Sequence, residues 1–402
     1  MKPRTLVSAC AAALLGATLL APAAAEAQTS PNANCQNLPG NVSDEGWTSH
    51  EQLGDRLAAI EARSSGRLDV SVIGESRRGR DIWAARVGTG DRVLLVTSEI
   101  HGNEKTGTEA LLRVLQELAT SNSAEAEAIR EGITLVAVPK FNPDGAELNR
   151  RQNDFPWTEV EQEFPQLAGQ EPPFYYSTGA KGFDVNRDFN ARLDLTNPQP
   201  SDLPTNETEP GAYLTNEGQA LRDLYVGLRA EFGAVDAYVD LHHRGPCDQQ
   251  NDTGQYPTVA LDFPPLGSEA LGNPRYDDWP LLDQDKSRRF ALAAALGMAD
   301  HAGSSATSPF SGGATRYVHQ QIADGYSFDR DFAGQARSAF ALNGTGTVLF
   351  EVRGQQDDWG QKEKGLLVSA VEAGVEGIAQ RMADDSVDTL NGDDFYGLPK
   401  YW

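Results

Sequence analysis

The sequence predicts an α/β fold, a three-layer sandwich in which helices flank a twisted, mixed and mostly parallel central sheet. Amphipathic helical stretches alternate along the chain with short β-branched runs. Several of these runs, at 93–96, 133–138 and 348–350, are almost continuously apolar, which is typical of strands covered on both faces. The 402 residues, 39% of them hydrophobic, are enough for a sizeable core.

The spacing of apolar residues predicts the individual elements. Helices are predicted at residues 50–63, 106–119, 217–231, 286–301 and 364–382. Strands are predicted at residues 68–73, 82–87, 93–97, 133–138, 235–241 and 347–352. Two long polar segments, at about 152–183 and 245–285, have no clear period, and loops of this length are usually functional or mobile.

Residues 1–27 have the pattern of a secretory signal peptide. Lys2 and Arg4 form a positive n-region, residues 6–20 form an apolar h-region, and residues 25–27 form an A-x-A cleavage site. A transmembrane anchor needs about 20 apolar residues with a stop-transfer flank, whereas this run is shorter and ends in Ala and Pro. The sequence therefore predicts a secreted or periplasmic protein with no integral membrane segment after cleavage.

The remaining chain divides into a polar leader at 28–45, a large body at 46–383 and a tail at 384–402. The tail is acidic and then aromatic, and we expect a docked or frayed terminus. Cys35 and Cys247 could form one disulfide in an oxidising compartment, which would join the leader to the body.

The charge of the chain excludes some partners. Lys and Arg number 34 against 58 Asp and Glu, and the net charge of −24 is not offset by a basic patch. Nucleic acid and anionic membranes are therefore not expected partners. A serine hydrolase is also disfavoured, because the sequence has no G-x-S-x-G motif.

A histidine and a glutamate follow the predicted strand at 93–97. His101 and Glu104 stand three residues apart ahead of a predicted helix, and a neutral imidazole with a carboxylate is a suitable pair of zinc ligands. Catalytic zinc needs a third protein ligand, and His242 and His243 directly follow the predicted strand at 235–241. Adjacent strand residues point to opposite faces, so one of these two histidines is expected to bind metal and the other to have a neighbouring role.

Further polar residues lie in the third strand and in two loops. Glu351 is embedded in an apolar strand, where it suits a general base for water or, alternatively, a buried salt bridge to Arg353. Residues 142–145 read Asn-Pro-Asp-Gly and predict a turn. The arginines and asparagines within 151–153 and 184–188 could clamp a substrate carboxylate.

Taken in chain order, the motifs HGNE, NPDG, R-x-N, D-x-NR, DLH and FEVRG resemble those of the zinc carboxypeptidases related to carboxypeptidase A, over about residues 46–383. The resemblance implies a catalytic domain over this range, with the zinc site at the C-terminal ends of the strands. It implies one Zn²⁺ per chain. The implied substrates are peptides or proteins with a free C-terminus, whose last peptide bond is hydrolysed.

The resemblance also implies a role for each matching residue. His101, Glu104 and His242 would bind zinc, His242 being preferred over His243 because it directly follows the Asp-Leu pair. Glu351 matches the general base and acid of the family.

Four more positions match substrate-handling residues of the family. Asn186 and Arg187 would hold the C-terminal carboxylate, and Arg151, with Arg150 as its rival, would stabilise the oxyanion. Tyr326 or Tyr317 would close over the substrate, and Tyr326 is preferred.

The chain departs from the digestive members of this family at Asn103, where those enzymes have arginine, and at Asp188, where they tend to have asparagine. These departures leave the fine subsite preference undetermined. Two alternative functions also stay open. One is a zinc amidase or deacylase acting on N-acyl amino acids or cell-wall peptides, and the other is a non-catalytic binding protein, although all the ligands and the base are present.

Overall fold

The computed structural model describes residues 46–245, 258–266, 276–277, 279–302, 314–316, 320–322, 325–327, 331–354 and 360–399. The predicted signal peptide and leader, the candidate disulfide between Cys35 and Cys247, and Tyr317 lie outside these residues. No helix in the described ranges combines the length and the apolar character that a membrane span requires.

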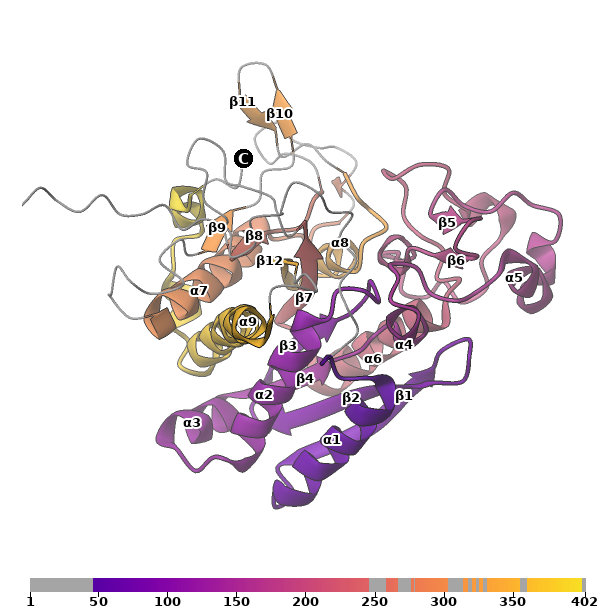
Figure 1. Ribbon diagram of the computed structural model, residues 1–402. Helices are drawn as coiled ribbons and strands as arrows, with labels where there is room; N and C mark the ends of the chain where they lie inside the picture. The colour runs from indigo at the N-terminus through magenta and orange to yellow at the C-terminus, as the bar shows by residue number, and fades with distance from the viewer. Residues whose placement is uncertain are drawn as a thin grey trace, which may run out of the picture.

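A mixed sheet is the centre of the molecule (Figure 1). Within the described residues it has eight strands in the order β1-β2-β4-β3-β7-β12-β8-β9. Their bounds are Leu68–Glu75 (β1), Asp81–Gly88 (β2), Ile133–Val138 (β4), Arg92–Ser98 (β3), Ala237–Arg244 (β7), Gly346–Arg353 (β12), Val259–Asp262 (β8) and Ala314–Arg316 (β9). The central strands β4, β3, β7 and β12 run parallel, whereas β1, β2 and β8 join the sheet antiparallel. The predicted mixed, mostly parallel sheet is confirmed.

Helices cover both faces of this sheet, because alternate side chains of each strand point to opposite sides. Leu94 and Val96 of β3 belong to the larger core, beneath α1 (His50–Arg63), α2 (Thr106–Thr120), α3 (Ala124–Gly132), α7 (Gln284–Ala302) and α9 (Gly360–Ala383). Val93 and Leu95 face the opposite way, toward α6 (Asn216–Phe232) and α8 (Ala336–Leu342). On that side the rings of Tyr225 and Phe340 stack with centroids 4.0 Å apart.

Two local predictions need correction. Residues 142–145 do not form an isolated turn but begin α4 (Pro143–Glu147), in which the Asn142 side chain accepts a hydrogen bond of 2.9 Å from the Gly145 amide. Asn at the N-cap and Pro at the first helical position start a helix as readily as they form a turn.

The segment at 152–183 is also more ordered than its lack of period predicts. It contains α5 (Trp157–Glu163) and the short paired strands β5 (Tyr176–Ser177) and β6 (Gly182–Phe183). Phe155, Trp157 and Phe183 belong to a separate aromatic cluster. This satellite core holds the segment in place without a helical or strand period in the sequence.

The C-terminal tail docks on the body. It forms the short 3-10 helices Ser386–Thr389 and Gly392–Gly397, and Phe395 is fully buried with its ring 5.7 Å from that of Phe263. Burial of an aromatic ring offsets the entropy lost on ordering a terminus.

One buried carboxyl group predicts a pH-dependent stability. Glu217, in the first turn of α6, is fully buried, and its one hydrogen-bonded oxygen accepts from the Asn153 amide at 3.0 Å. Burial raises the pKa of Glu217 to about 7. The folded state then binds the Glu217 proton more tightly than the unfolded state does. The contribution of Glu217 to stability is therefore greatest below the ordinary pKa of glutamate and falls as the pH rises toward 7.

We therefore compare the unfolding free energies of Glu217→Gln and the wild type at pH 5 and at pH 8. From the lower to the higher pH, the difference should shift by roughly 2 kcal/mol in favour of the variant. Chemical denaturation at both pH values measures it. The same substitution at Glu131, an exposed residue of α3, controls for the loss of a surface carboxylate. A difference that does not change with pH would show that Glu217 is already ionised in the folded protein at pH 5.

Candidate metal centre and its cavity

Three parallel strands bring the candidate residues to one edge of the sheet. His101 and Glu104 lie in the turn between β3 and α2, and His242 lies near the end of β7. Glu351 of β12 stands directly opposite His242 in the strand register. The carboxyl ends of parallel strands meet at one edge, which is where open α/β sheets bind ligands.

The turn that carries His101 and Glu104 is shaped by its contact with α4. The Phe141 and Asn142 amides donate to the carbonyls of Ser98 and Glu99 at 2.9 and 3.0 Å. A Cβ at Gly102 would collide with the backbone of Gly145, so a glycine is required for this approach. The HGNE and NPDG motifs therefore form one packed unit.

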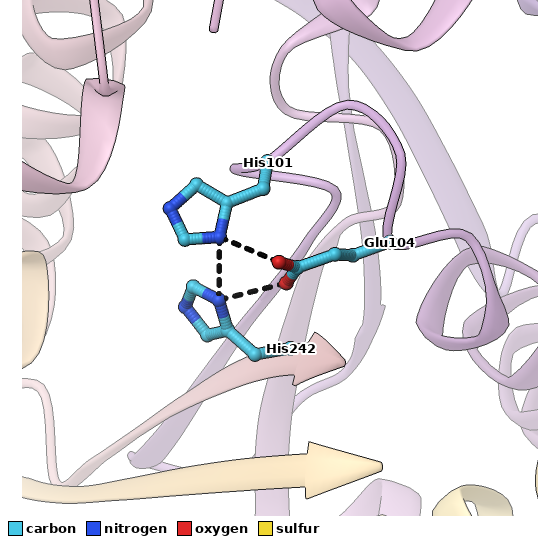
Figure 2. Close-up of side chains that lie close together, drawn as sticks. All are labelled: His101, Glu104 and His242. Atoms are coloured by element: carbon cyan, nitrogen blue, oxygen red, sulfur yellow. Dashed lines mark hydrogen bonds and ion pairs between the residues drawn. The ribbon is translucent and has the colours of Figure 1, made fainter. Parts of the chain in front are cut away.

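Two imidazoles and a carboxylate converge at this turn (Figure 2). The Nδ1 atoms of His101 and His242 lie 2.8 and 2.9 Å from the two oxygens of Glu104, and 3.0 Å from each other. All three residues are buried.

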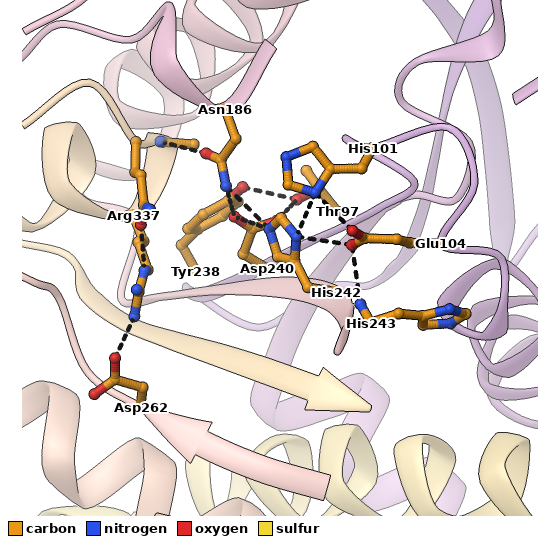
Figure 3. Close-up of polar contacts among 12 residues, drawn as sticks. Thr97, His101, Glu104, Asn186, Tyr238, Asp240, His242, His243, Asp262 and Arg337 are labelled. Atoms are coloured by element: carbon orange, nitrogen blue, oxygen red, sulfur yellow. Dashed lines mark hydrogen bonds and ion pairs between the residues drawn. The ribbon is translucent and has the colours of Figure 1, made fainter. Parts of the chain in front are cut away.

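The opposite nitrogen of each ring is held by a carboxylate. His101 Nε2 lies 3.1 Å from Asp184 Oδ1. His242 Nε2 lies 2.9 Å from Asp240 Oδ2 (Figure 3). A carboxylate accepts the N–H at Nε2, which leaves the lone pair of Nδ1 directed at the shared centre. Sequence reasoning did not assign this role to either aspartate, although Asp240 and His242, two residues apart on one strand, share a face.

The donor set fits a divalent metal ion. The ligand atoms of His101, Glu104 and His242 all lie within 4.8 Å of one another. Burial alone would raise the pKa of Glu104, but the attraction of the two imidazoles in their protonated form outweighs it and holds the pKa well below its ordinary value, so the carboxylate is ionised; a bound metal ion takes the place of the ring protons. Two lone pairs and a carboxylate facing one point favour a cation there, and this combination of nitrogen and oxygen donors suits zinc.

A cavity of about 160 Å³ opens beside these three residues. The other sequence-predicted residues that line it are Arg151, Asn186, Arg187 and Glu351. All the candidate site residues whose side chains the structure describes therefore lie around one cavity. Tyr326 lies in β11 (Gly325–Ser327), which pairs with β10 (Gln320–Ile322), and its side chain is outside the described part of the structure.

The two candidate arginines have different surroundings. Arg151 donates to Asp184 Oδ2 at 2.8 Å, and its Nη1 lies 3.0 Å from His101 Nδ1. Burial lowers the pKa of Arg151, but Asp184 and Glu104 outweigh it and raise the pKa, so the guanidinium stays charged. Arg150 instead donates to the Ala180 carbonyl at 2.7 Å. Of the two, Arg151 is the one that lines the cavity.

Asn186 and Arg187 reach the cavity from the 3-10 helix Val185–Arg187. Asn186 Nδ2 lies 3.0 Å from His242 Nε2, and the Arg187 guanidinium lies over the Phe332 ring, 4.9 Å from its centroid. The aromatic face holds this cation beside the cavity.

Glu351 and His243 complete the surroundings of the candidate metal centre. Burial raises the pKa of Glu351 to about 7, and the carboxylate has no hydrogen-bond or ion-pair partner among the described residues, Arg353 included. The His243 side chain turns toward α2, where its Nε2 accepts from the Thr106 amide at 3.0 Å. The two adjacent histidines therefore point to different sides of the strand, as their alternation predicts.

Comparison with known proteins shows what this chain is similar to. Residues 54–248 match the family model described as zinc carboxypeptidase. This part of the chain is therefore similar to zinc carboxypeptidases. The match includes the HGNE, NPDG, D-x-NR and DLH motifs and ends before the strand that carries Glu351.

Two solved structures share the fold. Carboxypeptidase A from Helicoverpa armigera is 17% identical with a TM-score of 0.54, and the alignment covers 87% of this chain and 77% of that one. Bovine thrombin-activatable fibrinolysis inhibitor, solved in complex with tick carboxypeptidase inhibitor, is 14% identical with a TM-score of 0.54, and the alignment covers 85% of this chain and 99% of that one. The fold shared with these structures therefore extends beyond residues 54–248.

Proposed function

We propose that the protein is an exported zinc-dependent carboxypeptidase, which removes the C-terminal residue of peptides or proteins. The observation that carries this proposal is the joint position of four groups in one cavity. They are the ligand set of two histidines and Glu104, the Glu351 carboxylate, and the two guanidinium groups of Arg151 and Arg187.

His101, Glu104 and His242 would hold one Zn²⁺ per chain. The ion supplies Lewis-acid polarisation of the scissile carbonyl and increases the acidity of water. Glu351 accepts the proton of the attacking water and passes it to the leaving amine, for which its raised pKa is suited.

The remaining cavity residues position the substrate. Arg187 and Asn186 bind the terminal carboxylate, so that only the last peptide bond reaches the reaction centre. Arg151 stays charged and stabilises the developing oxyanion. Tyr326 is proposed to close over the bound chain end.

A peptide pool tests the proposal directly. The mature protein is incubated with mixed synthetic peptides, with and without a zinc chelator, and the products are identified by mass spectrometry. We expect ladders that lose one C-terminal residue at a time and that disappear with the chelator. Intact peptides with one zinc still bound per chain would refute the carboxypeptidase and favour N-acyl amino acids or cell-wall peptides as substrates.

The carboxylate behind His242 gives a prediction about metal affinity. Asp240 is fully buried and lies 2.9 Å from His242 Nε2. We expect Asp240→Asn to weaken zinc binding about 10- to 100-fold, because the neutral amide orients and polarises the imidazole less strongly. Competition with a chromophoric chelator measures this affinity, and Asp223→Asn, at an exposed position of α6, is the control. Unchanged zinc affinity would remove Asp240 from the metal centre.

A further inference from the structure

The far wall of the active-site cavity contains an arginine and a glutamine that the proposed chemistry does not use. Arg337, in the first turn of α8, and Gln335, the residue before the helix, both line the cavity. Arg337 is almost completely buried, with 1% of its surface exposed. A buried arginine beside a substrate cavity is costly unless it is paired or binds a ligand.

Part of each side chain is fixed by protein contacts. Arg337 Nε donates to Gln335 Oε1 at 2.7 Å, and Arg337 Nη1 donates to Asp262 Oδ2 at 3.1 Å and to the Phe263 carbonyl at 2.8 Å. Figure 3 shows the guanidinium directed toward Asp262. These contacts hold the guanidinium in one orientation.

Two donor groups remain. Among the described residues, neither Nη2 of Arg337 nor Nε2 of Gln335 makes a hydrogen bond. Neither nitrogen is fully enclosed by the protein, so both keep some accessible surface. Because both side chains line the cavity, these nitrogens are available to a ligand there. Two donors without an acceptor select a group that only accepts hydrogen bonds, and a carboxylate is the strongest such group.

This wall adjoins the residue proposed to hold the chain end. The Ala336 amide, at the start of α8, donates to Asn186 Oδ1 at 3.1 Å, and a Cβ at Gly334 would collide with the Arg187 backbone. A terminal residue whose α-carboxylate is bound by Arg187 therefore lies beside the start of α8. Its side chain can extend along Leu349 toward Gln335 and Arg337.

A basic side chain is disfavoured at this position. Asp262 could attract a cation, but it does not line the cavity, and its oxygen Oδ2 already accepts from Arg337. A lysine or arginine of the substrate would instead meet the Arg337 guanidinium.

We propose that the cavity selects a C-terminal residue with an acidic side chain, glutamate or aspartate, through Arg337 and Gln335. This inference rests on the proposed carboxypeptidase function and adds its substrate class.

Four matched substrates test the preference. They are N-acyl dipeptides that share the acyl group and the penultimate residue and end in Glu, Gln, Leu or Lys. We expect kcat/KM to be highest for Glu, about 10- to 100-fold above Gln, which has the same shape without the charge. A kcat/KM for Gln, Leu or Lys that equals or exceeds that for Glu would overturn the inference but leave the carboxypeptidase in place. If none of the four is hydrolysed and the peptide pool also stays intact, it is the proposed function that fails.

Two variants connect the preference to these residues. The double variant Arg337→Met with Asp262→Asn removes both partners of the ion pair, so that no unpaired charge is left buried. Gln335→Glu keeps Arg337 and adds a negative charge at the cavity wall. In both, the ratio of kcat/KM for Glu to that for Gln should fall to about one or below, and Gln335→Glu decides the matter if the double variant does not fold. Arg113→Met, on the exposed side of α2, controls for the loss of a positive charge. A wild-type ratio in Gln335→Glu would refute the assignment.

Discussion

Replacing Glu351 with glutamine should remove almost all turnover and leave the zinc in place. We expect kcat to fall about 10²- to 10⁴-fold, because an amide cannot accept the proton of water at the moment of attack. Glu351 faces His242 across two paired strands and lines the cavity, and burial raises the pKa of Glu351 to about 7. The measurements are kcat on a C-terminally cleaved peptide and the zinc content per chain.

Glu376 provides a matched control for this experiment. It lies on α9, and burial raises its pKa to about 7 as well, but it does not line the active-site cavity. Glu376→Gln should therefore keep its turnover. Turnover within a few-fold of the wild type in Glu351→Gln would exclude Glu351 as the general base.

Replacing His242 with alanine should abolish zinc binding and, with it, activity. One of the ligand atoms is lost, and Glu104 and His101 remain as an incomplete set. We expect the zinc affinity to fall more than about 100-fold. This exceeds the loss that is typical when a residue hydrogen-bonded to a metal ligand is replaced. Zinc content after dialysis against a weak chelator measures the effect.

The neighbouring His243 makes this test specific. Its imidazole accepts from the Thr106 amide on the side of α2, and it is not part of the ligand group. His243→Ala should therefore retain one zinc per chain. Loss of zinc in His243→Ala together with its retention in His242→Ala would reverse the assignment.

Much of the fold follows from local patterns in the sequence. The predicted helix at 50–63 and strand at 133–138 coincide with α1 and β4, because hydrophobic period and strand composition are properties of consecutive residues. The short helix α8 was not predicted, since it has only seven residues, all of them buried, and so gives no distinct amphipathic period. Because this helix was not predicted, Gln335 and Arg337 were not among the candidate site residues.

The sequence by itself determined the mixed α/β sheet and the order of the motifs, and with these the family resemblance. Only the tertiary structure decided which side chains share the cavity. It directs His242 rather than His243 toward Glu104, places Arg151 rather than Arg150 at the cavity, and adds Arg337 from a helix more than two hundred residues beyond His101. Local periodicity reports how neighbouring residues fold, whereas these distances depend on parallel strands that the chain joins only through long crossovers.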